Sequence, residues 1–256
     1  MRAADELRIL VESSLEELEL TAELGGLREA MRYAYEAGGK RVRPVLCLAT
    51  AEAAGSSAEA ALPAACAVEL VHTFSLVHDD LPALDDDDER RGRPSAHVAF
   101  GEGTALLAGD ALLTEALRLS LAYPGGAVTR ELTEATLRMI GGQYRDVTGD
   151  DADLASLHRL KTGALLSASV GCGLWAAGVP EGGQPSWRAF GDELGLLFQA
   201  VDDLLDGDGY AARLGEDGAR ALADEAALRA HARLAEVPGE TEVLAGLVDT
   251  LAARTS

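Results

Sequence analysis

The chain has 256 residues, of which 48% are apolar and only 4% aromatic. Its formal charge of −21 argues against a nucleic-acid-binding protein, because nucleic acid phosphates require Lys and Arg on the protein surface. The length allows a buried core, and a composition dominated by Ala and Leu favours helices packed on helices over a sheet. We therefore expect an all-α fold in which residues 1–256 form a single domain.

The cysteines and the apolar runs bear on the compartment. Cys47, Cys66 and Cys172 lie among small apolar residues and show no paired spacing, which predicts buried thiols in a reducing compartment. No basic start is followed by an apolar run, and we find no uncharged apolar stretch of about 18 residues. These features predict a cytoplasmic protein without a signal peptide or a transmembrane segment.

The apolar residues recur at helical spacing along most of the chain, and Gly and Pro separate the helical segments. Pro82 should end a long, almost wholly apolar helix, and a polar loop should follow it at 85–95. No segment shows the alternating pattern of a strand. The expected helices are 3–20, a second one between Gly26 and Gly38, 43–55, 57–81, 101–122, 127–148, 153–178, 186–206, 210–235 and 240–254.

Two clusters of aspartates lie at the ends of otherwise apolar helices. They are Asp79, Asp80 and Asp85, and Asp202, Asp203 and Asp206. Buried carboxylates are unfavourable unless cations neutralise them, and hard oxygen ligands suit Mg²⁺, which often also binds substrate phosphates. A solvated acidic loop is an equally good explanation of 85–89 alone. It does not explain two separate clusters within apolar helices.

Lysine occurs at only two positions, Lys40 and Lys161, whereas arginine occurs at twenty. The compact ammonium group of Lys and the planar guanidinium of Arg bind phosphates differently, so a phosphate site can require Lys. Chance retention is the alternative explanation. Both lysines lie in recognisable motifs.

These motifs recur in the order found in one enzyme family. The chain resembles the trans-isoprenyl diphosphate synthases, in particular the short-chain farnesyl and geranylgeranyl diphosphate synthases of bacteria, over roughly residues 35–206. The matching segments are Gly38–Pro44, His72–Asp85, Arg90–Pro94, Ala108–Leu112, Gly141–Gln143, Lys161–Leu165 and Phe198–Asp206. The resemblance implies an isoprenoid synthase helical bundle around a central cavity.

The resemblance also implies a role for each motif residue. It implies that three Mg²⁺ ions bind per active site, two at Asp79 and Asp85 with Asp80 in support, and one at Asp202 with Asp203 and Asp206 around it. It assigns the allylic diphosphate to Arg90, Lys161, Thr162 and Gln199, and isopentenyl diphosphate to Lys40, Arg43, His72 and Arg91. From the sequence pattern alone, a core histidine is the favoured explanation of His72, and surface charges explain Arg90 and Arg91 equally well.

The implied reaction is a condensation of isopentenyl diphosphate with an allylic diphosphate to give a short-chain trans-prenyl diphosphate. Phe74 lies five residues before Asp79, and so about 7–8 Å deeper along the same helix. By resemblance, Phe74 and Ser75 would form the floor of the pocket and limit the product to about C15. Core packing is the alternative role of Phe74. Family members pair through helices such as 101–122, so the resemblance also implies a homodimer.

The chain departs from the family directly after Asp206. Similar synthases have about twenty further residues there, with two lysines that contact the allylic diphosphate, whereas here Gly207-Asp208-Gly209 leads straight into the last helices. Two other functions therefore remain open. One is a regulatory subunit that binds diphosphate and modifies a partner synthase. The other is a class I terpene cyclase, which would not need Lys40, Arg43 and Arg91.

Overall fold

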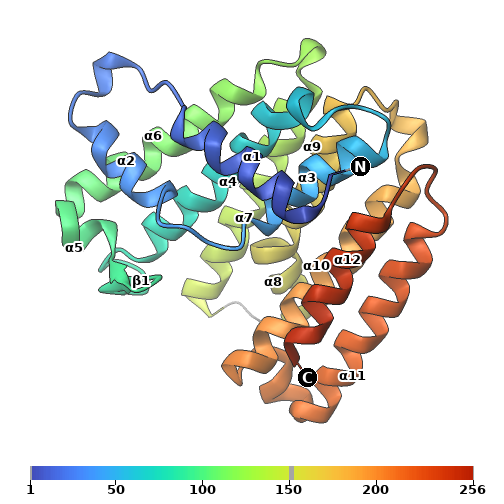
Figure 1. Ribbon diagram of the computed structural model, residues 1–256. Helices are drawn as coiled ribbons and strands as arrows, with labels where there is room; N and C mark the ends of the chain where they lie inside the picture. Colours follow the sequence, from blue (N-terminus) through green and yellow to red (C-terminus); the bar gives the residue numbers. More distant parts are fainter. Residues whose placement is uncertain (1, 150–152, 256) are drawn as a thin grey trace.

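The computed structural model describes residues 2–149 and 153–255, and almost all of its regular structure is helical (Figure 1). The helices are α1 (Ala4–Glu16), η1 (Ala22–Leu24), α2 (Leu27–Tyr35), α3 (Val42–Ala53), α4 (Ala58–Asp79), α5 (Ala96–Phe100), α6 (Glu102–Ser120), η2 (Pro124–Gly126), α7 (Ala127–Thr148), α8 (Leu154–His158), η3 (Arg159–Gly163), α9 (Ala164–Ala176), η4 (Glu181–Gly183), α10 (Pro185–Asp206), α11 (Gly209–Leu234), α12 (Glu242–Ala252) and η5 (Ala253–Thr255). The strands are β1 (Glu89–Arg90) and β2 (Arg93–Pro94). The expected all-α class is confirmed.

The centre of the bundle is α4, which packs against α3, α6 and α9. Most of its residues are buried, and it is long and apolar enough to cross a membrane by those criteria alone. Two thirds of that apolar window is buried inside the protein, as expected of the core helix of a bundle. Because α4 is surrounded by other helices, its C-terminal residue Asp79 lies largely inside the protein.

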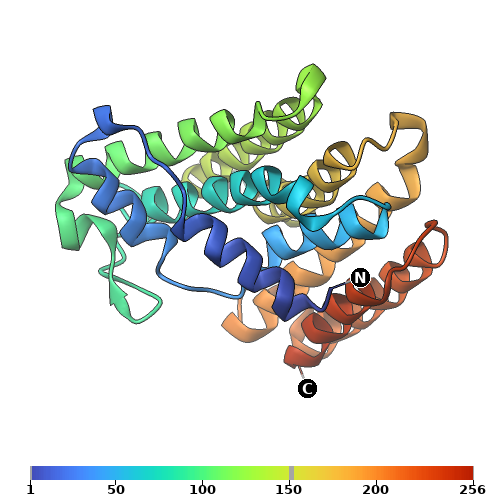
Figure 2. The same ribbon diagram turned by 45° about the horizontal axis from the view of Figure 1, so that its top comes forward.

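The last two long helices, α11 and α12, lie together beside α10 (Figure 2). The expected short connection is present: α10 ends at Asp206, Gly207 adopts a left-handed conformation with φ of 73°, and α11 begins at Gly209. Helix α11 returns along α10, and α12 then runs back so that η5 contacts α10 again. The end of α12 is thereby placed beside the second aspartate cluster.

The expected helices are present, with α5 in addition and a non-helical residue, Gly215 with φ of 75°, inside α11. Three further differences concern the first helix, the helix 153–178 and the loop 85–95. The first helix ends at Glu16 instead of Leu20. The expected helix 153–178 is interrupted by η3, a π-helical turn. The expected loop 85–95 contains a two-strand hairpin, in which the central residues Arg91 and Gly92 have φ of 56° and 74°. Positive φ at both central positions is typical of the tight turns that close such hairpins.

Candidate active site

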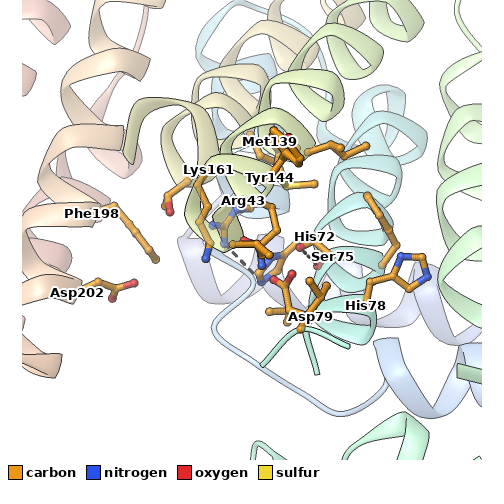
Figure 3. Close-up of a pocket in the computed structure, with 18 residues that line it drawn as sticks. Arg43, His72, Ser75, His78, Asp79, Met139, Tyr144, Lys161, Phe198 and Asp202 are labelled. Carbon is orange, nitrogen blue, oxygen red and sulfur yellow. Dashed lines mark hydrogen bonds between the residues drawn. The ribbon is translucent and has the colours of Figure 1, made fainter. Parts of the chain in front are cut away.

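A cavity of about 510 Å³ lies between the C-terminal ends of α4 and α10, with α7 and η3 forming another side (Figure 3). It has a polar end and a mainly apolar remainder. The polar or charged lining residues are Arg43, His72, Ser75, His78, Asp79, Gln143, Tyr144, Lys161, Thr162 and Asp202. The apolar ones are Phe74, Leu76, Leu84, Met139, Ile140, Val147, Leu165 and Phe198. We refer to this space as the first cavity.

Asp79 supplies the acidic group at the end of α4. The loop that follows folds back on the helix, with the backbone N–H of Asp85 donating to the carbonyl of Asp79 at 2.9 Å. Burial, helped by the nearby carboxylates of Asp85 and Asp80 and opposed by Lys161 and Arg90, raises the pKa of Asp79 to about 6. A carboxylate held in this way is stabilised by any cation that binds beside it.

Asp202 lies across the first cavity from Asp79, on α10 (Figure 3). Burial raises its pKa as well, and Arg254 and Arg43 oppose that shift. The guanidinium Nη1 of Arg254, in η5, lies 3.6 Å from Oδ1 of Asp202. The two aspartate clusters therefore each contribute one carboxylate to the same cavity, from opposite sides.

Lys161 and Thr162 enter the first cavity from η3. This turn is packed closely between α7 and α10. A Cβ on Gly142 of α7 would lie 2.6 Å from the backbone N of Lys161. A Cβ on Gly195 of α10 would lie 3.2 Å from Cα of Gly163. Gly142 therefore leaves room that a side chain would take from the backbone of Lys161, and the approach at Gly195 is tight. The Lys161 ammonium forms an ion pair with Asp146 of α7.

A second cavity of about 520 Å³ adjoins the first, because Arg43, His72 and Phe198 line both. Its other lining residues include Lys40 and Arg91. Its charged groups are mainly cationic, with Glu69 as the exception, and Glu69 is already paired with the buried Arg41. Burial, together with the surrounding arginines, holds the pKa of His72 well below its usual value, so His72 is neutral.

The hairpin directs its two adjacent arginines to different places. Arg90 pairs with Asp80, donating from Nε at 2.9 Å, and also contacts Asp87 at 3.1 Å. Arg91 instead reaches the carbonyl of Gly38 and lines the second cavity. Arg90 is absent from the lining of both cavities.

Of the other expected site residues, Asp80 is buried at the end of α4, and Asp85 and Asp206 are exposed but near enough to raise the pKa of Asp79 and Asp202, respectively. Asp203 and Gln199 face away from the first cavity and are hydrogen-bonded to one another at 2.6 Å. The structure thus gathers most of the predicted residues around the two cavities. Those that line neither are Asp80, Asp85, Arg90, Gln199, Asp203 and Asp206.

Four residues near the site were assigned no role from the sequence, although Gln143 belongs to one of the matching segments. Asp146 follows Gln143 by three residues on one helix, a spacing that could have been noticed. Gln143 lines the first cavity, and its amide atoms are buried without hydrogen-bond partners in the described part of the chain. His158 precedes η3, and Arg254 reaches Asp202 only through the packing of η5 on α10.

The donor groups around the first cavity fit magnesium. Asp79, Asp85 and Asp202 offer hard oxygen ligands, and burial of Asp79 favours a neutralising cation. Among residues 2–149 and 153–255, no three ligand-type side chains are grouped closely enough to hold a metal alone. Mg²⁺ commonly binds through one or two carboxylates and substrate phosphates, so this sparse set suits a metal shared with a diphosphate.

Comparison with known proteins agrees with this geometry. A geranyltransferase structure from Legionella pneumophila superimposes with a TM-score of 0.85 at 32% identity, covering 98% of this chain and 94% of that one. The fold and the facing acidic helix ends thus define an all-α bundle of the isoprenyl diphosphate synthase type.

Two curated relatives and a family model narrow the class. A farnesyl diphosphate synthase of Bacillus subtilis (strain 168) is 42% identical over 205 residues, covering 74% of this chain and 69% of the relative. A geranylgeranyl diphosphate synthase of Cyanophora paradoxa is 42% identical over 193 residues, covering 70% of this chain and 64% of the relative. The polyprenyl synthetase model matches residues 25–227. The chain belongs to the polyprenyl synthetase family.

Proposed function

We propose that the protein condenses isopentenyl diphosphate with an allylic diphosphate, dimethylallyl or geranyl, and so forms a short-chain trans-prenyl diphosphate, C15 in length. Family membership supports trans-prenyl chain elongation. The observation that carries the proposal for this chain is the pair of adjoining cavities, one lined by facing carboxylates and one by cations. A condensation of two diphosphates needs two anion sites that share a wall.

The first cavity is proposed as the allylic site. Asp79 and Asp202, with the exposed Asp85 and Asp206 of the same clusters, would hold three Mg²⁺ ions, which would supply the positive charge that stabilises a departing diphosphate. Lys161 and Thr162 face the same space and would bind the diphosphate directly. The ion pair of Lys161 with Asp146 keeps the ammonium at the edge of the cavity until a phosphate is bound there.

The second cavity is proposed as the isopentenyl diphosphate site. Lys40, Arg43 and Arg91 would bind the diphosphate, and neutral His72 would donate a hydrogen bond to it. The Arg43 guanidinium lies 3.5 Å from Nε2 of His72 and 5.4 Å from the ring centroid of Phe198. Because Arg43 lies in the shared wall, it fixes the second substrate directly beside the first.

The reaction then follows from charge and exclusion of water. The allylic C–O bond breaks, the double bond of isopentenyl diphosphate attacks the resulting cation, and a proton is lost, for which we propose the released diphosphate as base. Lys161 and Thr162 hold the departing group, so negative charge develops beside fixed donors. The apolar lining of the first cavity, including Met139, Ile140 and Leu165, keeps water away from the cation.

The product length is proposed to be set by Phe74 and Ser75, which line the first cavity one turn or more below Asp79. Phe74 is almost completely buried and packs edge-on against His78, with ring centroids 5.6 Å apart. The ring thus fills the space below Asp79 that a longer tail would need. This arrangement supports a C15 product.

We propose that the protein is a homodimer and is located in the cytoplasm. Helices α6 and α7 carry exposed apolar side chains that a partner would cover, namely Leu106, Leu107, Leu137, Ile140, Tyr144 and Val147. Cys47, Cys66 and Cys172 are free and buried, which suits a reducing compartment.

A product assay tests the proposal. The purified protein is incubated with Mg²⁺, labelled isopentenyl diphosphate and each of the C5, C10 and C15 allylic diphosphates, and products are separated by chain length. We expect C15 from the C5 and C10 primers. Magnesium-dependent binding of both substrates without any product would instead indicate a regulatory subunit. Cyclised hydrocarbon formed without isopentenyl diphosphate would indicate a terpene cyclase.

A further inference from the structure

Asp203 follows Asp202 directly in α10, but its side chain does not line the first cavity. Its Oδ1 accepts a hydrogen bond from Nε2 of Gln199 at 2.6 Å, and its Oδ2 accepts one from the backbone N–H of Tyr210 at 2.7 Å. The side chain is only 3% exposed. A buried carboxylate with both oxygens engaged inside the protein is poorly placed to bind a metal ion in the cavity.

The imidazole of His158 faces the same carboxylate. Nδ1 of His158 lies 3.6 Å from Oδ2 of Asp203, and this nitrogen is buried without a hydrogen-bond partner in the described part of the chain. The ring of Tyr210 packs edge-on against the imidazole, with centroids 5.0 Å apart. A Cβ on Gly209 would overlap the Asp203 carboxylate, so glycine is required where α11 begins. The contact is thus enclosed by the start of α11.

His158 also has a fixed relation to the catalytic lysine. It is the last residue of α8 and directly precedes η3, the π-helical turn that carries Lys161 and Thr162. π-Helical turns are rare and occur mostly as single turns within α-helices, often at functional sites. The conformation of this turn therefore depends on the elements packed around it. The turn contacts α7 and α10, and the Asp203–His158 contact joins its first end to α10.

We propose that Asp203 and His158 are positioning residues that set the place of Lys161 relative to Asp202 across the first cavity. Two adjacent residues of α10 then have different roles. Asp202 faces the substrate, whereas Asp203 contacts His158 and so supports η3, which carries Lys161. Gln199 acts in the same assembly by fixing the Asp203 carboxylate. This inference rests on the proposed function, and it assigns Asp203 to the scaffold of the site and not to the metal ions.

The first test compares replacements of His158. Asparagine places an amide near the position of Nδ1, where it can contact Asp203, whereas alanine has no polar group there and glutamine extends its amide toward the position of Nε2. We expect H158A and H158Q to raise KM for the allylic diphosphate and lower kcat about tenfold each, since a misplaced cationic donor weakens both binding and reaction. KM for isopentenyl diphosphate should stay unchanged, because that substrate occupies the second cavity. H158N should recover most of the activity.

The matched control is His231→Ala on α11. The imidazole of His231 contacts Asp249 at 2.8 Å and lines neither cavity. It should leave both KM values and kcat unchanged. Thermal unfolding of each variant is followed by circular dichroism. If H158N is as impaired as H158A while both remain folded, or if H158A changes the two KM values equally, the positioning role of His158 is wrong.

The second test separates a positioning role of Asp203 from metal binding. A non-reactive thio analogue of the allylic diphosphate is titrated into wild type and Asp203→Asn by calorimetry at several Mg²⁺ concentrations. We expect weaker analogue binding in the variant at every concentration, with the same Mg²⁺ concentration giving half-maximal binding. An increased Mg²⁺ requirement at unchanged saturated affinity would show that Asp203 binds metal and would overturn the inference. This readout needs no turnover, so it holds even if the wild type forms no product.

Discussion

Replacement of Asp79 by asparagine should stabilise the metal-free protein while it strongly slows the reaction. Burial raises the pKa of Asp79 to about 6 from a reference value of 3.8, so the folded state holds the proton more tightly than the unfolded state. The stabilisation from that proton is therefore present at low pH and lost as the pH rises through about 6. At neutral pH the ionised carboxylate opposes folding.

The magnitude follows from the shift. About two pH units correspond to roughly 3 kcal/mol, and partial contact with water reduces this to about 1–3 kcal/mol. D79N should gain this amount in the free energy of unfolding at pH 7.5, and the gain should fall to about 1 kcal/mol or less near pH 4.5, where folded wild type is largely protonated. Turnover should fall by at least about 100-fold, because a ligand of the proposed metals is lost.

The assay is urea unfolding with EDTA present, followed by circular dichroism at both pH values. Asp224→Asn is the control, since Asp224 is exposed on α11 and should leave stability unchanged at either pH. A D79N protein that is less stable than wild type at pH 7.5 without metal would refute the reasoning. It would show that the carboxylate is already satisfied by groups within the chain.

Three further variants test other parts of the site. Phe74→Ala should lengthen the product beyond C15, measured by chromatography of the dephosphorylated products, and an unchanged distribution would exclude a role in chain length. Arg254→Ala should lower the Mg²⁺ concentration for half-maximal activity about two- to fivefold, because the guanidinium 3.6 Å from Asp202 competes with the metal. An unaltered or higher Mg²⁺ concentration for half-maximal activity would contradict this. Leu107→Glu should convert the proposed dimer to a monomer in analytical ultracentrifugation, whereas Leu228→Glu, also exposed but on α11, should not. A wild type that sediments as a monomer would remove the basis of that prediction.

The sequence predicted the helices well because they depend on local periodicity and on Gly and Pro. It also predicted which helix ends carry the acidic groups. Asp79 lies at the end of a helix too apolar to be anywhere but the core, so its carboxylate had to be inside. The convergence of Asp79 and Asp202 on one cavity is long-range, and the expectation came from the resemblance to the family.

Side-chain direction could not be predicted where the backbone departs from a regular helix. Arg90 and Arg91 are adjacent, but the tight hairpin turn sends one to Asp80 and the other to the second cavity. Within α10, Asp202 and Asp203 differ because the neighbours of each face differ: open cavity for one, and the start of α11 for the other. Adjacent residues of a helix point about 100° apart, but spacing alone does not tell which of the two carboxylates faces the cavity.

The contact of Arg254 with Asp202 had no sequence signal. Fifty-two positions separate the two residues, and they meet because α12 runs back beside α10 after the α11 turn. The π-helical turn η3 was also invisible, since its residues read as one continuous helix from 153 to 178. Its form depends on close approach to Gly142 and Gly195, which is a property of packing and not of local pattern.

The most direct test of the account is a crystal structure of the protein with Mg²⁺ and a non-reactive allylic diphosphate analogue. We predict cations between the carboxylates of Asp79 and Asp202, with the diphosphate also contacting Lys161 and the hydrocarbon tail directed toward Phe74. An analogue bound in the first cavity with no cation between these two aspartates, or bound outside that cavity, would contradict the central claim.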